Sequence, residues 1–177
     1  YLNAFHFVCD GSRYDSLKTA MEKYGMELGE EEEIVMAAIQ ANGAALKFCS
    51  ERLRGEEKMV RAAMESFGYG RIEGMLQFGD NVSTMVGRIM KEELKEKEER
   101  LGADHSHTLS LVNNLGMLLQ DQGKLKEAEP LLRRALEGSE RTLGPDHSDT
   151  LTSVNNLGML LQAQGKLNEA EPLLRRA

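Results

Sequence analysis

The chain has 177 residues, of which 29% are charged and 41% hydrophobic, and its net charge is −7. This composition is typical of a folded globular protein, and the 5% aromatic content without Trp favours helices packed through aliphatic side chains over a β-sandwich. The acidic balance argues against nucleic acid and anionic membrane surfaces as partners. Because no run of about 18 apolar residues occurs, we also expect no membrane insertion.

Residues 1–68 are predicted to form a helical region with a weak repeat of about 25 residues. Two segments that start at Glu31 and Glu56 align, and each predicts a helix with an acidic start and an apolar stripe. Gly43 and Gly68 follow the two stripes, and we interpret them as helix C-caps. Between the two copies, residues 44–49 indicate a short second helix.

Residues 69–80 are interpreted as a Gly-rich linker, because Gly70, Gly74 and Gly79 interrupt any helical pattern. The pattern becomes helical again over residues 81–100. Shifted by 42 positions, this segment falls on residues 123–142, so we interpret it as a degenerate second helix of a preceding repeat. We expect the run of charges in its second half to be a solvated face rather than a binding tail.

The strongest pattern in the chain is a 42-residue repeat. Residues 101–135 recur as residues 143–177, with 29 of 35 positions identical. A period of this length predicts stacked units that share one core, here a repeat at 101–142 and a truncated repeat at 143–177. Because the chain begins at Tyr1 and stops inside the second copy, we expect it to be a piece of a longer protein.

Each repeat is predicted to contain two helices, which in the first copy cover residues 108–122 and 125–142. Ser106 or Thr108 is expected to cap the first helix, and Gly123 to break the chain between the two. The periodicity places Gly116 at the closest approach of the pair. The residues expected opposite it form a small-large-small face of Ala128, Leu132 and Ala135.

The spacing of Leu115-Gly116, Leu119, Gly123, Ala128, Leu132 and Ala135 resembles that of a tetratricopeptide repeat. The length of 42 residues, the Leu-Gly-Pro-Asp-His connection and the Asn-Asn-Leu-Gly helix are similar to kinesin light chain repeats. The resemblance covers residues 81–177 and implies an all-α solenoid of helical hairpins whose first helices line a concave groove. Residues 1–68 resemble, more loosely, a short helical repeat family of unassigned function.

The resemblance also implies a peptide-binding groove, because first-helix asparagines in that family can bond the backbone of an extended cargo peptide. Helical spacing independently turns one arc of each first helix away from its partner, and an Asn side chain both donates and accepts there. The predicted groove residues are Asn113, Met117, Gln120, Asn155, Met159 and Gln162, with Asn114 and Asn156 nearer its edge. The alternative is that these asparagines solvate an exposed face or bond to an adjacent repeat.

No pattern indicates a metal, cofactor or catalytic site, so we expect no enzyme. His105 and His107 could suggest a metal site, but Asp149 replaces His107 in the second copy, and a capped loop is the better interpretation. Cys49 has no His or other base at a spacing typical of a nucleophile, and no phosphate-binding loop occurs. With Cys9 it is interpreted as a free thiol, which favours a cytoplasmic location.

The predicted function is that of a scaffold or adaptor whose partners are proteins or peptides. Two alternatives remain open: a regulatory or sensor array attached to an enzyme or a nucleotide-binding switch domain, and a structural spacer. Kinesin heavy chain is a partner that the family implies. The residues ahead of the repeats carry no long heptads, however, so the chain gives that association no support.

Overall fold

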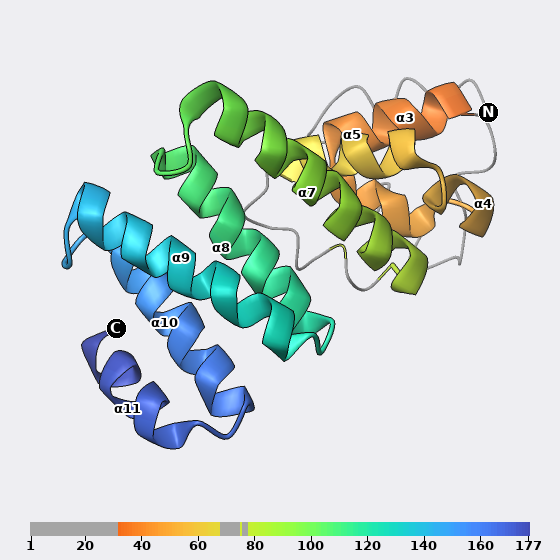
Figure 1. Ribbon diagram of the computed structural model, residues 1–177. Coiled ribbons are helices and arrows are strands. Elements are labelled where there is room, and N and C mark those ends of the chain that lie inside the picture. Colours follow the sequence, from red (N-terminus) through yellow and green to blue (C-terminus); the bar gives the residue numbers. More distant parts are fainter. Residues whose placement is uncertain (1–31, 68–74, 76–77) are drawn as a thin grey trace. The chain divides into compact units, whose positions relative to one another are not determined.

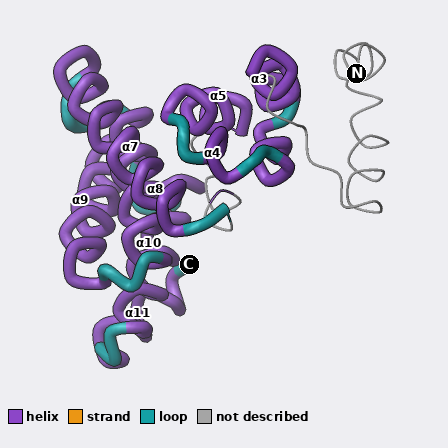
Figure 2. The backbone as a smooth tube through the Cα atoms, turned by 90° about the vertical axis from the view of Figure 1, so that its right-hand side faces the viewer, coloured by secondary structure: helices purple, strands orange, loops and turns teal. Residues whose placement is uncertain are grey.

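The computed structural model describes residues 32–67, 75 and 78–177, and all regular structure in these residues is helical (Figures 1 and 2). The chain forms two compact units, residues 1–86 and 87–177. Residues 1–31 of the predicted N-terminal region and most of the predicted linker at 69–80 lie outside the described residues.

The described part of the first unit contains short helices around one apolar core. The elements are α3 (Glu32–Ala41), the 3-10 helix η1 (Gly43–Phe48), α4 (Glu51–Arg54) and α5 (Glu57–Phe67). Helices α3 and α5 pack on each other and on η1, so the short helix predicted over residues 44–49 is confirmed in 3-10 form. The core side chains include Val35, Ile39, Leu46, Leu53, Met59, Val60 and Met64.

Gly43 does not act as the predicted left-handed C-cap, because its φ is not positive. Instead it is buried where α5 passes the end of α3. Its N–H donates to Ser66 Oγ at 2.9 Å, and an added Cβ would lie 2.6 Å from the carbonyl oxygen of Ala63. Glycine is therefore required here by the close approach of another helix, which the local sequence could not reveal.

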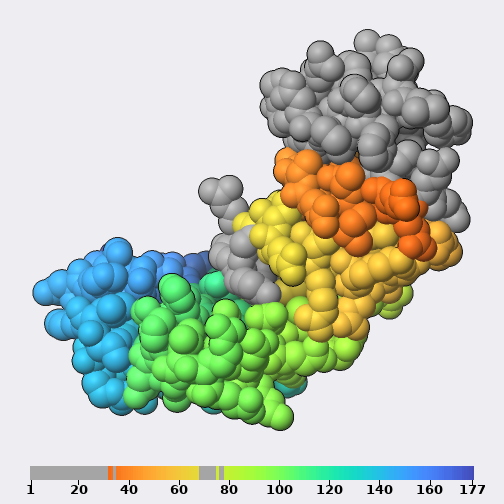
Figure 3. All heavy atoms as spheres, turned by 90° about the horizontal axis from the view of Figure 1, so that it is seen from above, coloured from red at the N-terminus to blue at the C-terminus, as the bar shows by residue number. Residues whose placement is uncertain are grey.

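The second unit is a stack of helical hairpins, as predicted. Helix α7 (Asp80–Leu101) contains the division between the units and leads into α8 (Ser106–Asp121), α9 (Leu125–Leu143), α10 (Ser148–Ala163) and α11 (Leu167–Arg176). Helix α9 packs on both α8 and α10, and α8 also contacts α10 (Figure 1). Drawn as spheres, the green to blue atoms of this unit form one packed body (Figure 3). This arrangement confirms the prediction of an all-α helical-hairpin solenoid.

The turns within the hairpins follow the predicted glycines. Gly123 has a φ of +73°, and the next N–H, of Lys124, donates to the carbonyl oxygen of Leu119 at 2.8 Å. Such a bond satisfies a carbonyl that the end of α8 would otherwise leave unpaired. Gly165 has the same role in the second copy, with a φ of +77°.

Histidines cap the first helix of each repeat, so the prediction that Ser106 or Thr108 caps α8 is wrong. His105 has an extended backbone, and its Nδ1 accepts the N–H of His107 at 3.2 Å. His147 accepts the N–H of Asp149 in the same way at 3.1 Å. The imidazole thus provides the acceptor that a hydroxyl or carboxylate usually supplies at this position.

Gly116 lies at the closest approach of α8 and α9, as predicted. A Cβ on Gly116 would lie 2.7 Å from Leu132 Cδ2, and Ala128, Leu132 and Ala135 are fully buried. Leu132 belongs to a core cluster that α8, α9, α10 and α11 share. The two repeats therefore stabilise each other through one continuous core, as expected for stacked units.

Ion pairs join α7 to α9 and α9 to α11. Arg134 lies 2.6 Å from Glu98 of α7, and one period later Arg176 lies 2.5 Å from Glu140 of α9. The carboxylate of Glu129 accepts from Lys166 at 2.7 Å and is also paired with Arg133. The Lys166–Glu129 and Arg176–Glu140 pairs link α11 to α9.

Lowering the pH should weaken the junction between α9 and α11 through Glu129. The Lys166 hydrogen bond, helped by one from Arg133, lowers the pKa of Glu129 from 4.5 to about 2. A depressed pKa contributes stability that is complete above the ordinary value and is lost as the pH falls towards the folded value. We therefore expect Glu129→Gln to cost about 1–2 kcal/mol near pH 6, after allowing for solvent screening, and almost nothing near pH 2.

Urea unfolding of the wild type and this variant at several pH values measures that difference. Glu137→Gln, which replaces an exposed glutamate of the same helix, is the matched control. If the cost of Glu129→Gln stayed constant from pH 6 to pH 2, the ion pairs would not be the source of the stability.

Candidate functional site

The side chains that α8 and α10 turn away from their partner helices form a surface that we call the first-helix face. Its half-buried and exposed members are His107, Ser110, Asn114, Met117, Gln120, Asp121, Asp149, Thr152, Asn155, Met159 and Gln162. Neither Ser106–Asp121 nor Ser148–Ala163 contains a Lys or Arg. The face therefore offers amides, hydroxyls, thioethers and carboxylates, with His107 as its only basic side chain.

Two of the predicted groove residues, Asn113 and Asn156, lie in contact between the repeats. Asn156 Nδ2 donates to Asn113 Oδ1 at 3.2 Å, and both side chains are buried. A paired, buried amide is held in one orientation, so this bond helps to set the position of α10 on α8. For these two residues, the structure therefore agrees with the alternative interpretation of the sequence, in which an asparagine bonds to an adjacent repeat.

The other predicted residues remain accessible to different degrees. Asn155 is half-buried and donates to Met159 Sδ at 3.4 Å, while Met159 is 43% exposed and Gln162 is exposed. Asn114, Met117 and Gln120 of the first copy are half-buried, and Met117 packs against the core cluster.

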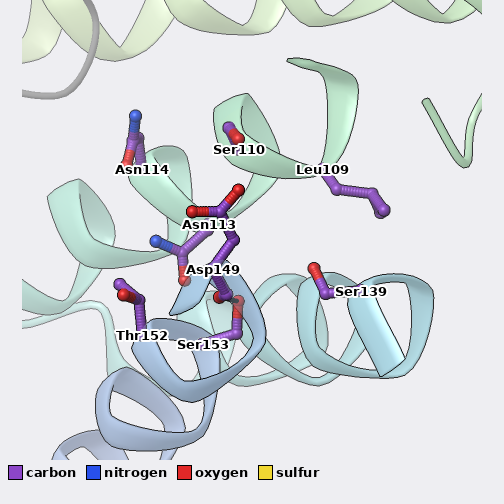
Figure 4. A pocket seen from close by; sticks show the side chains of 8 residues that line it. All are labelled: Leu109, Ser110, Asn113, Asn114, Ser139, Asp149, Thr152 and Ser153. Carbon is purple, nitrogen blue, oxygen red and sulfur yellow. Dashed lines mark hydrogen bonds between the residues drawn. The ribbon is translucent and has the colours of Figure 1, made fainter. Parts of the chain in front are cut away.

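A polar cleft of about 180 Å³ lies where the first halves of α8 and α10 meet the end of α9 (Figure 4). It is lined by Leu109, Ser110, Asn113, Asn114, Ser139, Asp149, Thr152 and Ser153. Ser139 is only 4% exposed, and its hydroxyl has no hydrogen-bond partner among the described residues. Thr152 and Ser153 donate their hydroxyl protons to carbonyls of their own helix at 2.9 and 3.0 Å, which leaves their oxygen lone pairs as acceptors.

Sequence reasoning predicted only Asn113 and Asn114 as groove residues among the eight that line this cleft, and it missed Ser139 and Asp149 among the others. Ser139 comes from α9, and only the packing of α9 against α8 and α10 brings it to the first-helix face. Asp149 stands one turn before Thr152, and this spacing along α10 was the signal that could have placed both on one face. The repeat pattern itself marks Asp149 only as the residue that stands where the first copy has His107.

Other chemistry is sparse in the described part of the chain. Burial raises the pKa of the Cys49 thiol to about 11, which makes it a poor nucleophile. Within the described ranges, no group of three or more His, Cys, Asp or Glu side chains could hold a metal ion. Among these same residues, no helix is both long enough and apolar enough to cross a membrane.

Comparison with known proteins agrees with the fold. Residues 106–177 match a family described as Tetratricopeptide repeat, which confirms that the 42-residue units are repeats of this type. Residues 31–78 match a family described as Domain of unknown function (DUF4116). None of the curated proteins compared with the chain matches it. Tetratricopeptide repeats generally mediate protein–protein interactions and are typically scaffolds rather than enzymes, so protein partners are indicated for this segment.

Proposed function

We propose that the chain is a protein-interaction scaffold whose first-helix face binds extended peptide segments of partner proteins, in the manner of kinesin light chain-like repeats. Exposed Met159 carries the proposal, because it is a large apolar side chain beside the amide of Asn155. An amide pairs with any peptide backbone, and a thioether adapts to apolar side chains. The proposed surface includes the predicted residues Met117, Gln120, Asn155, Met159 and Gln162, with Asn114 at its edge. The predicted residues Asn113 and Asn156 instead bond to each other in the junction of the repeats.

The opposite side of the stack supports this choice of surface. There the cations of α9 and α11 are largely taken up by carboxylates, as in the Arg133–Glu169 pair at 2.9 Å and the Lys166–Glu129 pair at 2.7 Å. A partner bound on that side would have to displace existing ion pairs. The exposed side chains of the first-helix face include Thr152, Met159 and Gln162. They are uncharged, so a partner bound there would break no ion pair.

Selection of a displayed random peptide library on the full chain tests the proposal. We expect peptides to be recovered, and the Asn155→Ala/Met159→Ala variant to bind them about tenfold more weakly, since two contacts worth roughly 1.4 kcal/mol in total are removed. Dissociation constants by fluorescence polarisation measure the change. Asn113→Ala is unsuitable for this test, because it would leave the buried Asn156 amide without its partner.

Asn168→Ala is the matched control, because Asn168 is an exposed asparagine of α11 outside the first-helix face. The control should bind the selected peptides like the wild type. Recovery of no peptide, or equal binding by Asn155→Ala/Met159→Ala and the wild type, would contradict the proposed function.

A further inference from the structure

The first-helix face is negatively charged at its cleft. The ionisable side chains on α8 and α10 are His107, Asp121 and Asp149, and no Lys or Arg occurs on either helix. An acidic peptide lying along this face would meet carboxylates and no strong cation. A basic peptide would meet a complementary charge, which favours its binding over that of other peptides.

Within the cleft, the Asp149 carboxylate lacks a cationic partner among the described residues. Its side chain is 60% exposed, and the ring nitrogen Nδ1 of His147 lies 3.9 Å from its Oδ2. That nitrogen accepts the backbone N–H of Asp149 at 3.1 Å, so it carries no proton that the carboxylate could accept. The charge of Asp149 is therefore available to a ligand.

Ser139 is a second and independent sign of a ligand. Its hydroxyl lies on a nearly buried residue, points into the cleft and has no partner among the described residues (Figure 4). A carboxylate in the first turn of a helix is favourable without any ligand, because it interacts with the helix dipole. The Ser139 hydroxyl has no such compensation: it lies on a nearly buried residue, opens only into the cleft, and has no partner there in the described part of the chain, whereas polar groups at such positions are normally hydrogen-bonded.

The size and lining of the cleft define the group that fits it. Pockets for small molecules usually measure about 300–1,000 Å³. A cleft of about 180 Å³ has room for little more than one side chain. Its lining is rich in hydrogen-bond acceptors. The hydroxyls of Thr152 and Ser153 donate to the carbonyl oxygens of Ser148 and Asp149, so only their oxygen lone pairs remain for a ligand.

We infer that this cleft binds the lysine side chain of an extended peptide. A lysine ammonium has three donors and no acceptor, which matches the Asp149 carboxylate together with the hydroxyl oxygens of Ser139 and Thr152. Asn113 and Asn114 line the same cleft, but the Asn113 oxygen already accepts from Asn156. The inference rests on the proposed function and adds the chemical class of its ligand.

The test uses peptides selected from the random library on the full chain. Lysine should be enriched over aspartate and glutamate among them. Acetylation of that lysine, which removes the charge, should weaken binding to the wild type about tenfold. In the Asp149→Asn variant the lysine and acetyl-lysine peptides should bind with nearly equal affinity. Asp149→His introduces the residue that the first copy has at this position, and it should likewise abolish the difference in affinity between the lysine and acetyl-lysine peptides.

Asp121→Asn is the control, because Asp121 is on the same face but outside the cleft, and this variant should still discriminate. Thermal unfolding checks that each variant is folded. If peptides bind at Asn155 and Met159 but acetylation has no effect, the inference is wrong and the proposed function stands. Discrimination that persists in Asp149→Asn also overturns the inference. If the library yields no peptide at all, both fail.

Discussion

Replacing Leu132 with Ala should lower the free energy of unfolding by about 2–5 kcal/mol. Leu132 is fully buried, lies against Gly116 and belongs to the cluster that both repeats share. Truncation removes apolar contacts and leaves a cavity that well-packed helices can only partly close. Because both repeats contribute to this cluster, the change should weaken the whole second unit rather than one hairpin.

The chain contains its own control for this prediction. Leu174 occupies the equivalent position of the second copy, in the same Glu-Pro-Leu-Leu-Arg-Arg motif, but it is only partly buried in α11. Leu174→Ala should therefore cost about 1 kcal/mol, in proportion to the smaller area that it buries. Urea unfolding followed by circular dichroism measures both changes. Equal costs for the two variants would contradict the shared core.

Replacing Asn113 with Leu should cost about 1–3 kcal/mol, because it leaves the buried Asn156 amide without its acceptor. Replacing both asparagines with Leu should cost less than the sum of the two single changes, since no polar group then remains unpaired. The same unfolding measurement, arranged as a double-mutant cycle, gives the coupling between the two residues. We expect a coupling of about 1 kcal/mol or more.

The half-buried neighbours Asn114 and Asn155 provide the comparison for this cycle. These residues lie on the same two helices, and Asn155 donates to the thioether of Met159 rather than to another asparagine. Asn114→Leu and Asn155→Leu should therefore be nearly additive. Additive costs for Asn113 and Asn156 would mean that their contact contributes nothing to the junction of the repeats.

The stacked fold could be predicted from the sequence because the repeat appears twice. Near-identity of the two copies fixes the period, and the apolar arc of α8 identifies the side that packs on α9. Gly116 stood out because it interrupts a run of larger side chains on that arc, opposite Leu132. These signals are local, or depend only on the period, so they do not require the three-dimensional arrangement.

The contacts between repeats could not be predicted in the same way. Asn113 and Asn156 are 43 residues apart, one more than the period, because the second asparagine of one copy meets the first asparagine of the other. Only the displacement of α10 along α8 determines that pairing. The period alone treats Asn113 and Asn155 as equivalent, whereas the first is buried in the junction and the second is half-buried on the first-helix face.

Two other features depended on the backbone rather than on residue type. His105 caps α8 because its extended backbone brings the ring over the first turn, a role that the neighbouring Ser106 suggested more strongly by composition. Gly43 is required by the passage of α5, which lies more than a dozen residues further along the chain. At α8 the local backbone decided which residue caps the helix, and at Gly43 the packing of α5 decided what role the predicted glycine has.

The central claim is that partner peptides bind to the first-helix face. Nuclear magnetic resonance of the ¹⁵N-labelled chain, titrated with a peptide from the library selection, tests it most directly. The side-chain amide signals of Asn155 and Gln162 should shift in proportion to the bound fraction, while those of Asn168 and Gln164 should stay unchanged. Shifts confined to Asn168 and Gln164 would place the peptide elsewhere and contradict the account.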